Sequence, residues 1–151
     1  MANIILISCA STKCQYKTEA QNMYISPLFV KSLRYAKNKL KSDIIFILSA
    51  KYGLLDLIDV IEPYNVTLCY VPKEKRKPDL KILTSEEKKD WGKKVLDTLS
   101  KQADLQNDEF IVLAGEEYIK PIEKGIKHLK NLLKGKSQGK RLQWLKEELN
   151  E

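Results

Sequence analysis

The chain has 151 residues, of which 43% are hydrophobic and 31% are charged. It is too apolar for a disordered protein, and it is long enough for one domain to bury a core without disulfides or a structural metal. The three cysteines show no CxxC spacing and His128 is the only histidine, so a zinc site is not expected. We predict a single domain over residues 1–151 with no metal and no cofactor.

The formal net charge is +7, and it is unevenly distributed. The stretch from Lys120 to Lys146 holds nine Lys or Arg residues and one acidic residue, Glu123. Such a stretch suits phosphates, although a solvated lysine-rich face has the same composition. We predict a nucleic-acid backbone surface here, including Lys136, Lys140 and Arg141.

The first half of the chain predicts a parallel crossover unit. Residues 3–8 form an apolar run typical of a strand buried on both faces. Ser26 and Pro27 are an N-cap and a first helical residue, and the apolar spacing that follows predicts a helix to about Lys41. Residues 44–48 predict a second buried strand, which would lie parallel to the first.

Beyond Gly53 we predict a long functional loop, with a short strand-like stretch over residues 66–71. Residues 84–87 form a capping box that opens a helix. Residues 110–114 predict a third strand, and the rest is expected to be helical apart from a break at residues 135–139. The expected fold class is α/β with a mostly parallel sheet.

The sequence gives no sign of export or of a membrane span. Its apolar run at residues 4–7 is far shorter than a signal-peptide core and lacks a basic leader. No other segment approaches the length of a membrane span. We therefore expect a cytoplasmic protein without a membrane partner.

The candidate site lies where the predicted strands end, because open parallel sheets bind ligands outside their carboxyl ends. Small residues there let a ligand approach the backbone, and hydroxyls supply hydrogen bonds. Helix caps and turns use the same residue types. The candidate substrate-binding residues at or beyond the three ends are Ser8, Cys9, Ser11, Ser49, Tyr52, Gly53, Gly115 and Tyr118. Three further candidates for substrate binding lie elsewhere in the sequence: Tyr24, Ser26 and Tyr64.

Few residues near these ends offer catalytic groups. Cys9 has no activating histidine nearby, so we expect it to pack rather than attack. Lys51 is a candidate phosphate contact or Schiff-base amine. Asp56, Asp59 and Glu62 are the carboxylates of the loop predicted to face the pocket, and Glu62, with Asp56 as the alternative, is the proposed catalytic carboxylate.

The chain resembles a family of small bacterial and phage proteins catalogued as a domain of unknown function. The resemblance covers nearly the whole chain and is carried by six runs: SCASTK at 8–13, MYISPLF at 23–29, LSAKYGLL at 48–55, EPYNVTL at 62–68, AGEEY at 114–118 and GKRLQWL at 139–145.

A more distant resemblance concerns the spacing of Cys9 with Lys13 and of Tyr24 with Ser26. These pairs are similar to the core domain of archaeosine synthase, which acts on a deazaguanine base and is related in fold to uracil-DNA glycosylases. The resemblance implies a three-layer αβα fold of the uracil-DNA glycosylase type. That relative carries Lys-Pro-Tyr where this chain has Lys13 followed by Cys-Gln, so its lysine chemistry does not transfer directly.

The leading functional hypothesis is a DNA glycosylase that hydrolyses the N-glycosidic bond of a base, including modified bases, with phage defence as a setting. Tyr52, Tyr64 and Tyr118 are candidates to stack on an extruded base. The nucleophile is either water or the amine of Lys13. The alternatives are a transferase or hydrolase of a free nucleotide or deazapurine nucleoside, and a non-catalytic nucleic-acid-binding module; DNA is expected rather than RNA.

Overall fold

The central sheet has five strands in the order β4-β3-β1-β8-β9. The computed structural model describes residues 2–151. Strands β3, β1, β8 and β9 run parallel, whereas β4 is antiparallel to β3. The bounds are Asn3–Ser8 for β1, Ile44–Ser49 for β3, Gly53–Asp56 for β4, Glu109–Leu113 for β8 and Leu129–Asn131 for β9.

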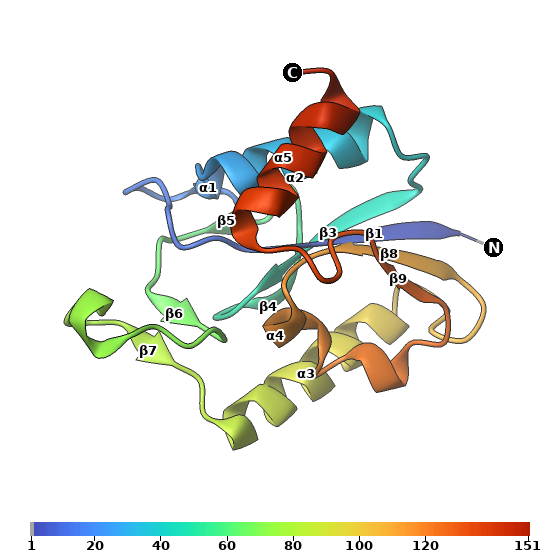
Figure 1. The fold of residues 1–151 in the computed structure, drawn as a ribbon. Coiled ribbons are helices and arrows are strands. Elements are labelled where there is room, and N and C mark those ends of the chain that lie inside the picture. The colour runs from blue at the N-terminus through green and yellow to red at the C-terminus, as the bar shows by residue number, and fades with distance from the viewer. Residues whose placement is uncertain (1) are drawn as a thin grey trace.

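Helices cover both faces of this sheet (Figure 1). Helices α2 (Pro27–Asn38) and α5 (Gln138–Leu149) lie on one face, and α3 (Ser85–Ser100) lies on the other. Each begins at a hydroxyl that accepts a hydrogen bond from the first turn: Ser26 for α2, Thr84 for α3 and Ser137 for α5. These caps satisfy amides that the helix itself leaves unpaired.

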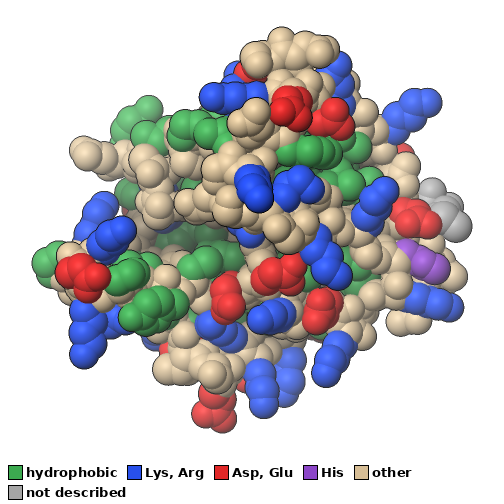
Figure 2. Space-filling view, viewed as in Figure 1, with side chains coloured by type: hydrophobic (Ala, Val, Ile, Leu, Met, Phe, Trp, Pro, Cys, Tyr) green, Lys and Arg blue, Asp and Glu red, His purple; other side chains and the backbone are tan. Residues whose placement is uncertain are grey.

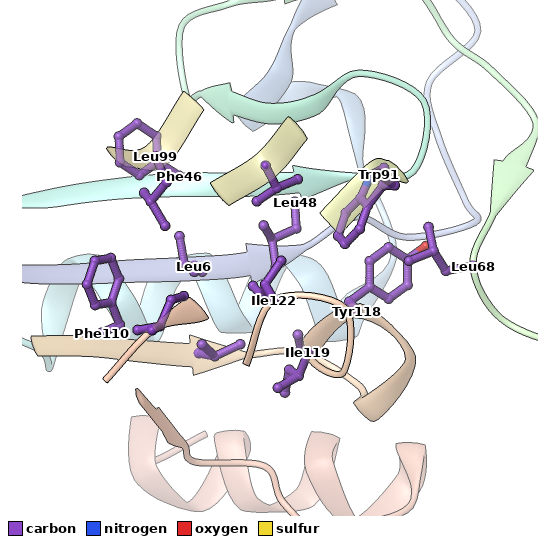
Figure 3. Packing of buried hydrophobic residues seen from close by; sticks show 14 of the residues in the cluster. Leu6, Phe46, Leu48, Leu68, Trp91, Leu99, Phe110, Tyr118, Ile119 and Ile122 are labelled. Carbon is purple, nitrogen blue, oxygen red and sulfur yellow. The ribbon is translucent and has the colours of Figure 1, made fainter. Parts of the chain in front are cut away.

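The strands contribute side chains to two apolar cores, because successive side chains of a strand point to opposite faces of the sheet. Ile4 and Leu6 of β1 pack on the α3 side, while Ile5 and Ile7 pack on the α2 and α5 side. Figure 3 shows part of the α3-side core, where Leu6 lies among side chains of β3, β8 and α3. Burial on both faces explains why the strands are continuous apolar runs.

Shorter elements lie outside the central sheet. Strand β2 (Thr18–Glu19) pairs antiparallel with β5 (Val60–Ile61), and α1 (Ala20–Met23) follows β2 directly. Strand β6 (Val66–Thr67) pairs parallel with β7 (Lys81–Ile82), and a 3-10 turn, η1 (Lys73–Lys75), lies between them. After β8 come α4 (Glu116–Ile119) and a 3-10 turn, η2 (Glu123–Gly125).

The structure confirms the α/β class and the mostly parallel sheet, and it corrects four local predictions. The region after Gly115 is not continuously helical, because β9 pairs with β8 there. The segment after Gly53 is not only loop: Gly53 has a positive φ of 77° and opens β4. The stretch predicted as a strand over 66–71 is a strand only at Val66–Thr67.

The helix predicted to reach about Lys41 ends at Asn38. Within residues 2–151, no helix combines the length and the apolar character that crossing a membrane requires.

Candidate functional site

The surface is hollowed beyond the carboxyl ends of the parallel strands. Figure 2 shows this hollow between the β6–β7 segment and the start of α5, with hydrophobic side chains inside it and both basic and acidic side chains around it. Strands β3 and β8 lie on opposite sides of β1, so the strand order reverses at β1. Ligands of open α/β sheets bind at such a reversal.

A chain of hydroxyl groups forms one wall of the site. The Ser49 hydroxyl, at the end of β3, donates to the Tyr64 hydroxyl at 2.8 Å, and the hydroxyls of Tyr64 and Tyr24 share a hydrogen bond of 2.6 Å. The Tyr52 amide donates to the Ser49 hydroxyl at 3.0 Å, and the Trp91 indole donates to the Ser49 carbonyl at 2.8 Å. Ser49 is thus held from the sheet and from α3 at once.

Burial raises the pKa of Tyr24 and of Tyr64 well above the usual value, and the nearby Cys9 adds to the rise. Both phenols therefore stay protonated at neutral pH. A protonated phenol is a hydrogen-bond donor as well as an acceptor. The hydroxyl groups of this wall can therefore donate hydrogen bonds to a ligand on which negative charge develops, while the phenols themselves stay neutral.

Lys13 lies against this wall. Its ammonium is 4.4 Å from the centre of the Tyr64 ring and 6.0 Å from that of Tyr24, distances typical of cation–π contacts. A backbone bridge between Lys13 and Tyr24 fixes the segment, and the ammonium also donates to the Ser11 carbonyl at 3.4 Å. Burial lowers the pKa of Lys13, with a further contribution from Lys77, while Cys9 opposes the change. More of this amine is neutral at a given pH than of an exposed lysine.

Cys9 connects the first strand to the segment after β8. The Cys9 thiol donates to the Tyr118 hydroxyl at 3.4 Å. The Cys9 amide donates to the Leu48 carbonyl at 2.9 Å and so extends the hydrogen-bond ladder between β1 and β3 by one residue. Tyr118 is buried, and burial raises its pKa. Its ring packs edge-on against Trp91 with centroids 5.8 Å apart.

The structure therefore brings Cys9, Lys13, Tyr24, Ser49, Tyr64 and Tyr118 together. Tyr52 lies at the border of this group, with its ring 5.5 Å from that of Tyr64 and 37% of its surface exposed. The Lys51 ammonium is 5.3 Å from the centre of the Tyr52 ring, and Lys51 is exposed.

The predicted carboxylates are placed differently from one another. Glu62 is exposed, and its backbone carbonyl lies 3.5 Å from the Tyr52 hydroxyl at the border of the site. Asp56 was expected in a loop, but it lies on β4 opposite Phe46, three residues before Ser49. That is on the order of 10 Å from the strand end. The Asp56 amide donates to the Asp59 carboxylate at 2.8 Å, and burial together with Asp59 raises the pKa of the Asp56 carboxyl.

Other candidates have backbone roles in this structure. Ser26 caps α2, Gly53 makes the turn into β4, and Ser8 is the last residue of β1, opposite Leu48. Ser11 is exposed and contributes its carbonyl to Lys13.

Some basic residues of α5 and of the segment before it lie at the site, and others lie around it. A Cβ atom on Gly115 would lie 3.3 Å from the guanidinium of Arg141, so glycine lets Arg141 approach the end of β8. The Nε atom of Arg141 is buried and has no hydrogen-bond partner among residues 2–151. The Lys136 ammonium is 5.7 Å from the Trp144 ring centre beside a shallow hollow, and Lys140 is exposed in the first turn of α5.

Sequence reasoning missed two contributors. Trp91 anchors the end of β3, which only its packing on the sheet reveals. The basic run KEKRK at residues 73–77 was visible in the sequence, and Figure 1 shows that it lies in the segment between β6 and β7.

Comparison with known proteins places the chain in a family. A family model described as "Family of unknown function (DUF6884)" matches residues 4–147. A UPF0246 protein of Polynucleobacter necessarius subsp. necessarius (strain STIR1) is 34% identical over 95 residues, which are 62% of this chain and 34% of that protein. The chain thus spans about a third of the length of this curated relative. The family match runs over nearly the whole chain, and the chain belongs to the DUF6884 family.

Proposed function

We propose that this chain is a nucleobase-directed enzyme on nucleic acid, namely a DNA glycosylase that works in the cytoplasm and breaks the N-glycosidic bond of a base held in the hollow. The observation that carries the proposal is the partly buried Lys13 amine 4.4 Å from the Tyr64 ring, backed by the hydroxyls of Tyr24 and Ser49. An amine of lowered pKa beside neutral hydroxyl donors suits the attack on a sugar and the departure of a base.

The hydroxyl wall suits the departing base. Breaking the glycosidic bond leaves negative charge on the base, and donors aimed at that charge stabilise the transition state. The phenol of Tyr64 is held in position by Ser49 and Tyr24, so little reorganisation is needed during the reaction. The partly exposed Tyr52 ring offers a stacking face at the entrance.

The Lys13 amine is the nucleophile in this proposal. Its lone pair attacks C1′ of the deoxyribose and forms a C–N bond while the bond from C1′ to the base breaks. The electron pair of the broken bond leaves with the base, which takes up a proton. The nitrogen then loses a proton, the sugar ring opens with its oxygen taking one up, and a protonated imine joins the protein to the DNA.

The fold and the charge are consistent with a DNA substrate. We propose that the sheet is of the uracil-DNA glycosylase type, since helices cover both faces of a mostly parallel sheet and the polar cluster lies at its carboxyl ends. The exposed Lys140 and the Lys136 ammonium near Trp144 offer contacts for the backbone outside the hollow.

A second candidate is a transferase or hydrolase of a free nucleotide or deazapurine nucleoside. It is favoured by one observation: the Nε of Arg141, beside Gly115, is buried and finds no hydrogen-bond partner in the part of the chain that the structure describes. A guanidinium there suits the phosphate of a mononucleotide. Such an enzyme would turn over free nucleotides and leave duplex DNA unchanged.

Borohydride trapping tests the lysine route. The wild type is incubated with DNA duplexes that each carry one damaged or modified base, borohydride is added, and covalent protein–DNA adducts are resolved by mass. We expect an adduct that Lys13→Ala loses and that Lys51→Ala, in which an exposed lysine is removed, keeps. Because burial lowers the pKa of Lys13 from the usual 10.5, the adduct yield should rise with pH and level off below that value. Base release without any adduct would instead favour water as the nucleophile.

A further inference from the structure

The segment from β6 to β7, residues 66–82, forms an arm beside the hollow (Figure 1). Val66 pairs with Lys81 and Thr67 with Ile82, which closes the arm at its base. The buried Leu68 anchors it in the α3-side core. The arm is thus fixed to the body at its base while its outer part faces solvent.

The outer part of the arm is strongly basic. Residues 73–77 read KEKRK, and all five side chains are exposed. Among residues 2–151, the salt bridges of this structure include none made by these four basic side chains, whereas Lys81 at the base is paired with Glu87 at 2.8 Å. Glu74 is the one carboxylate within this run, so four cations and one anion leave the outer arm with a net positive charge.

An aromatic ring stands among these cations. Tyr70 is 75% exposed, and the Arg76 guanidinium carbon is 5.6 Å from the centre of its ring. The Arg76 Nε donates to the Val71 carbonyl at 2.7 Å, which holds the guanidinium beside the ring. A single exposed aromatic residue is unremarkable on a protein surface. A ring paired with a fixed guanidinium among phosphate-binding lysines is the composition of surfaces that stack unpaired bases.

The arm also lies beside the candidate site. It begins at Val66, two residues after Tyr64 of the hydroxyl wall, and it borders the hollow in Figure 2. A strand bound along the arm would therefore continue toward the hollow.

We propose that the arm binds an unpaired stretch of nucleic-acid strand, with one base stacked on Tyr70 and Arg76 and its phosphates on Lys73, Lys75 and Lys77. The inference rests on the proposed function only for what happens in the hollow, where a neighbouring nucleotide of the same strand would lie. An unpaired strand is favoured over a duplex because the faces of duplex bases are already stacked on one another, which leaves the Tyr70 ring no partner.

The test is fluorescence anisotropy with a labelled oligothymidylate of about 12 nucleotides, a length within the range of single-strand sites. The same strand paired with oligodeoxyadenylate and vesicles rich in phosphatidylserine are the competing probes. We expect the wild type to prefer the single strand. Tyr70→Ala should weaken that binding by about tenfold or more, since stacking on an aromatic ring contributes this much per base. Tyr70→Phe, which keeps the ring, should bind as the wild type does.

Charge variants distinguish binding by the lysines of the arm from binding by basic side chains elsewhere on the surface. Lys73→Ala with Lys75→Ala should weaken binding and flatten its salt dependence by roughly 0.7 per lost phosphate contact on a single strand. Lys101→Ala, which removes a 72% exposed lysine after α3, is the matched control and should leave both unchanged. The inference is overturned if Tyr70→Ala binds as tightly as the wild type, if the duplex is bound as well as the single strand, or if only the vesicles are bound.

Base release measured on the same variants distinguishes this inference from the proposed function. If no base is released from any DNA while Tyr70→Ala loses single-strand binding, the glycosylase proposal fails and the arm inference stands. If bases are released and Tyr70→Ala changes neither release nor binding, the arm inference alone fails.

Discussion

The two ends of the central sheet use polar side chains in opposite ways. At the amino end, Asp108 accepts from the amides of Ala2 and Asp104, both at 2.8 Å, and Asp43 accepts from the amide of Asn3 at 2.7 Å. At the carboxyl end, Ser49, Tyr64 and Tyr24 bond mainly to one another. The amino end thus satisfies the backbone, while the carboxyl end holds side chains in position around a hollow.

The pKa shifts at the two ends also have opposite causes. Hydrogen bonds from backbone amides lower the pKa of Asp108, whereas burial raises the pKa values of Tyr24 and Tyr64. A lowered carboxyl pKa contributes to folding stability at neutral pH. Replacing both partners of a buried hydrogen bond by apolar groups of the same shape can be nearly neutral for stability, and strongly shifted pKa values cluster at functional sites.

The largest expected effect concerns Glu62, the carboxylate that we propose for catalysis. Glu62→Gln should lower base release by about 100-fold if Glu62 stabilises the positive charge that develops on the sugar. Asp56→Asn is the matched control, because Asp56 lies on β4 away from the strand ends and should keep activity. Steady-state rates with DNA binding measured in parallel check this. Loss of activity in Asp56→Asn alone would indicate that the reaction takes place away from the carboxyl end of the sheet.

A smaller effect is expected from the basic surface of α5. Lys140→Glu with Arg141→Glu should weaken DNA binding and lower the slope of log affinity against log salt by roughly 0.9 per lost phosphate contact. Lys140→Glu alone tests the exposed contact without disturbing the partly buried Arg141. Affinity measured across a salt series is the readout. Unchanged affinity and slope in the double variant would place the DNA surface elsewhere.

The hydrogen bonds of the hydroxyl wall should also contribute to the free energy of unfolding. Ser49→Ala leaves the Tyr52 amide and the Tyr64 hydroxyl without a partner, so unfolding by urea should become easier by about 1–3 kcal/mol. Ser100→Ala removes an exposed hydroxyl at the end of α3 and should change stability by less than about 0.5 kcal/mol. Equal effects of the two substitutions would mean that the wall is not a connected unit.

The smallest effect belongs to the amino end and is a change in pH dependence. The pKa of Asp108 is lower in the folded state than the usual 3.8, so its stabilisation is present above 3.8 and is lost as the pH falls through the folded-state value. Asp108→Asn should reduce stability at neutral pH and make the acid side of the stability profile less steep. Urea midpoints between neutral pH and acid check this, and a profile of unchanged steepness would contradict it.

Much of the fold could be predicted because its signals are local. The apolar runs of β1, β3 and β8 and the caps of α2 and α3 each lie within a few residues of the element they define. Strand β9 could not be predicted: it is three residues long, carries an exposed lysine at its centre, and forms because β8 offers an edge. Strand β4 could not be predicted either, because the turn residues just before it favour a loop.

The site was predicted in part for the same reason. Residues at strand ends, such as Ser49 and Cys9, follow from the parallel sheet. The bond between Tyr24 and Tyr64 joins positions 40 residues apart, and no spacing in the sequence indicates it. The approach of Arg141 to Gly115 likewise depends on how α5 packs back on the sheet.

Base release is the most direct test of the central claim that chemistry on a nucleobase takes place at the carboxyl end of the sheet. Mass spectrometry would detect free base after incubation of the protein with single-stranded and duplex DNA carrying a panel of damaged and modified bases. The account predicts that the wild type releases at least one class of base and that Lys13→Ala, folded as judged by circular dichroism, does not. Retention of the base by every substrate would contradict it.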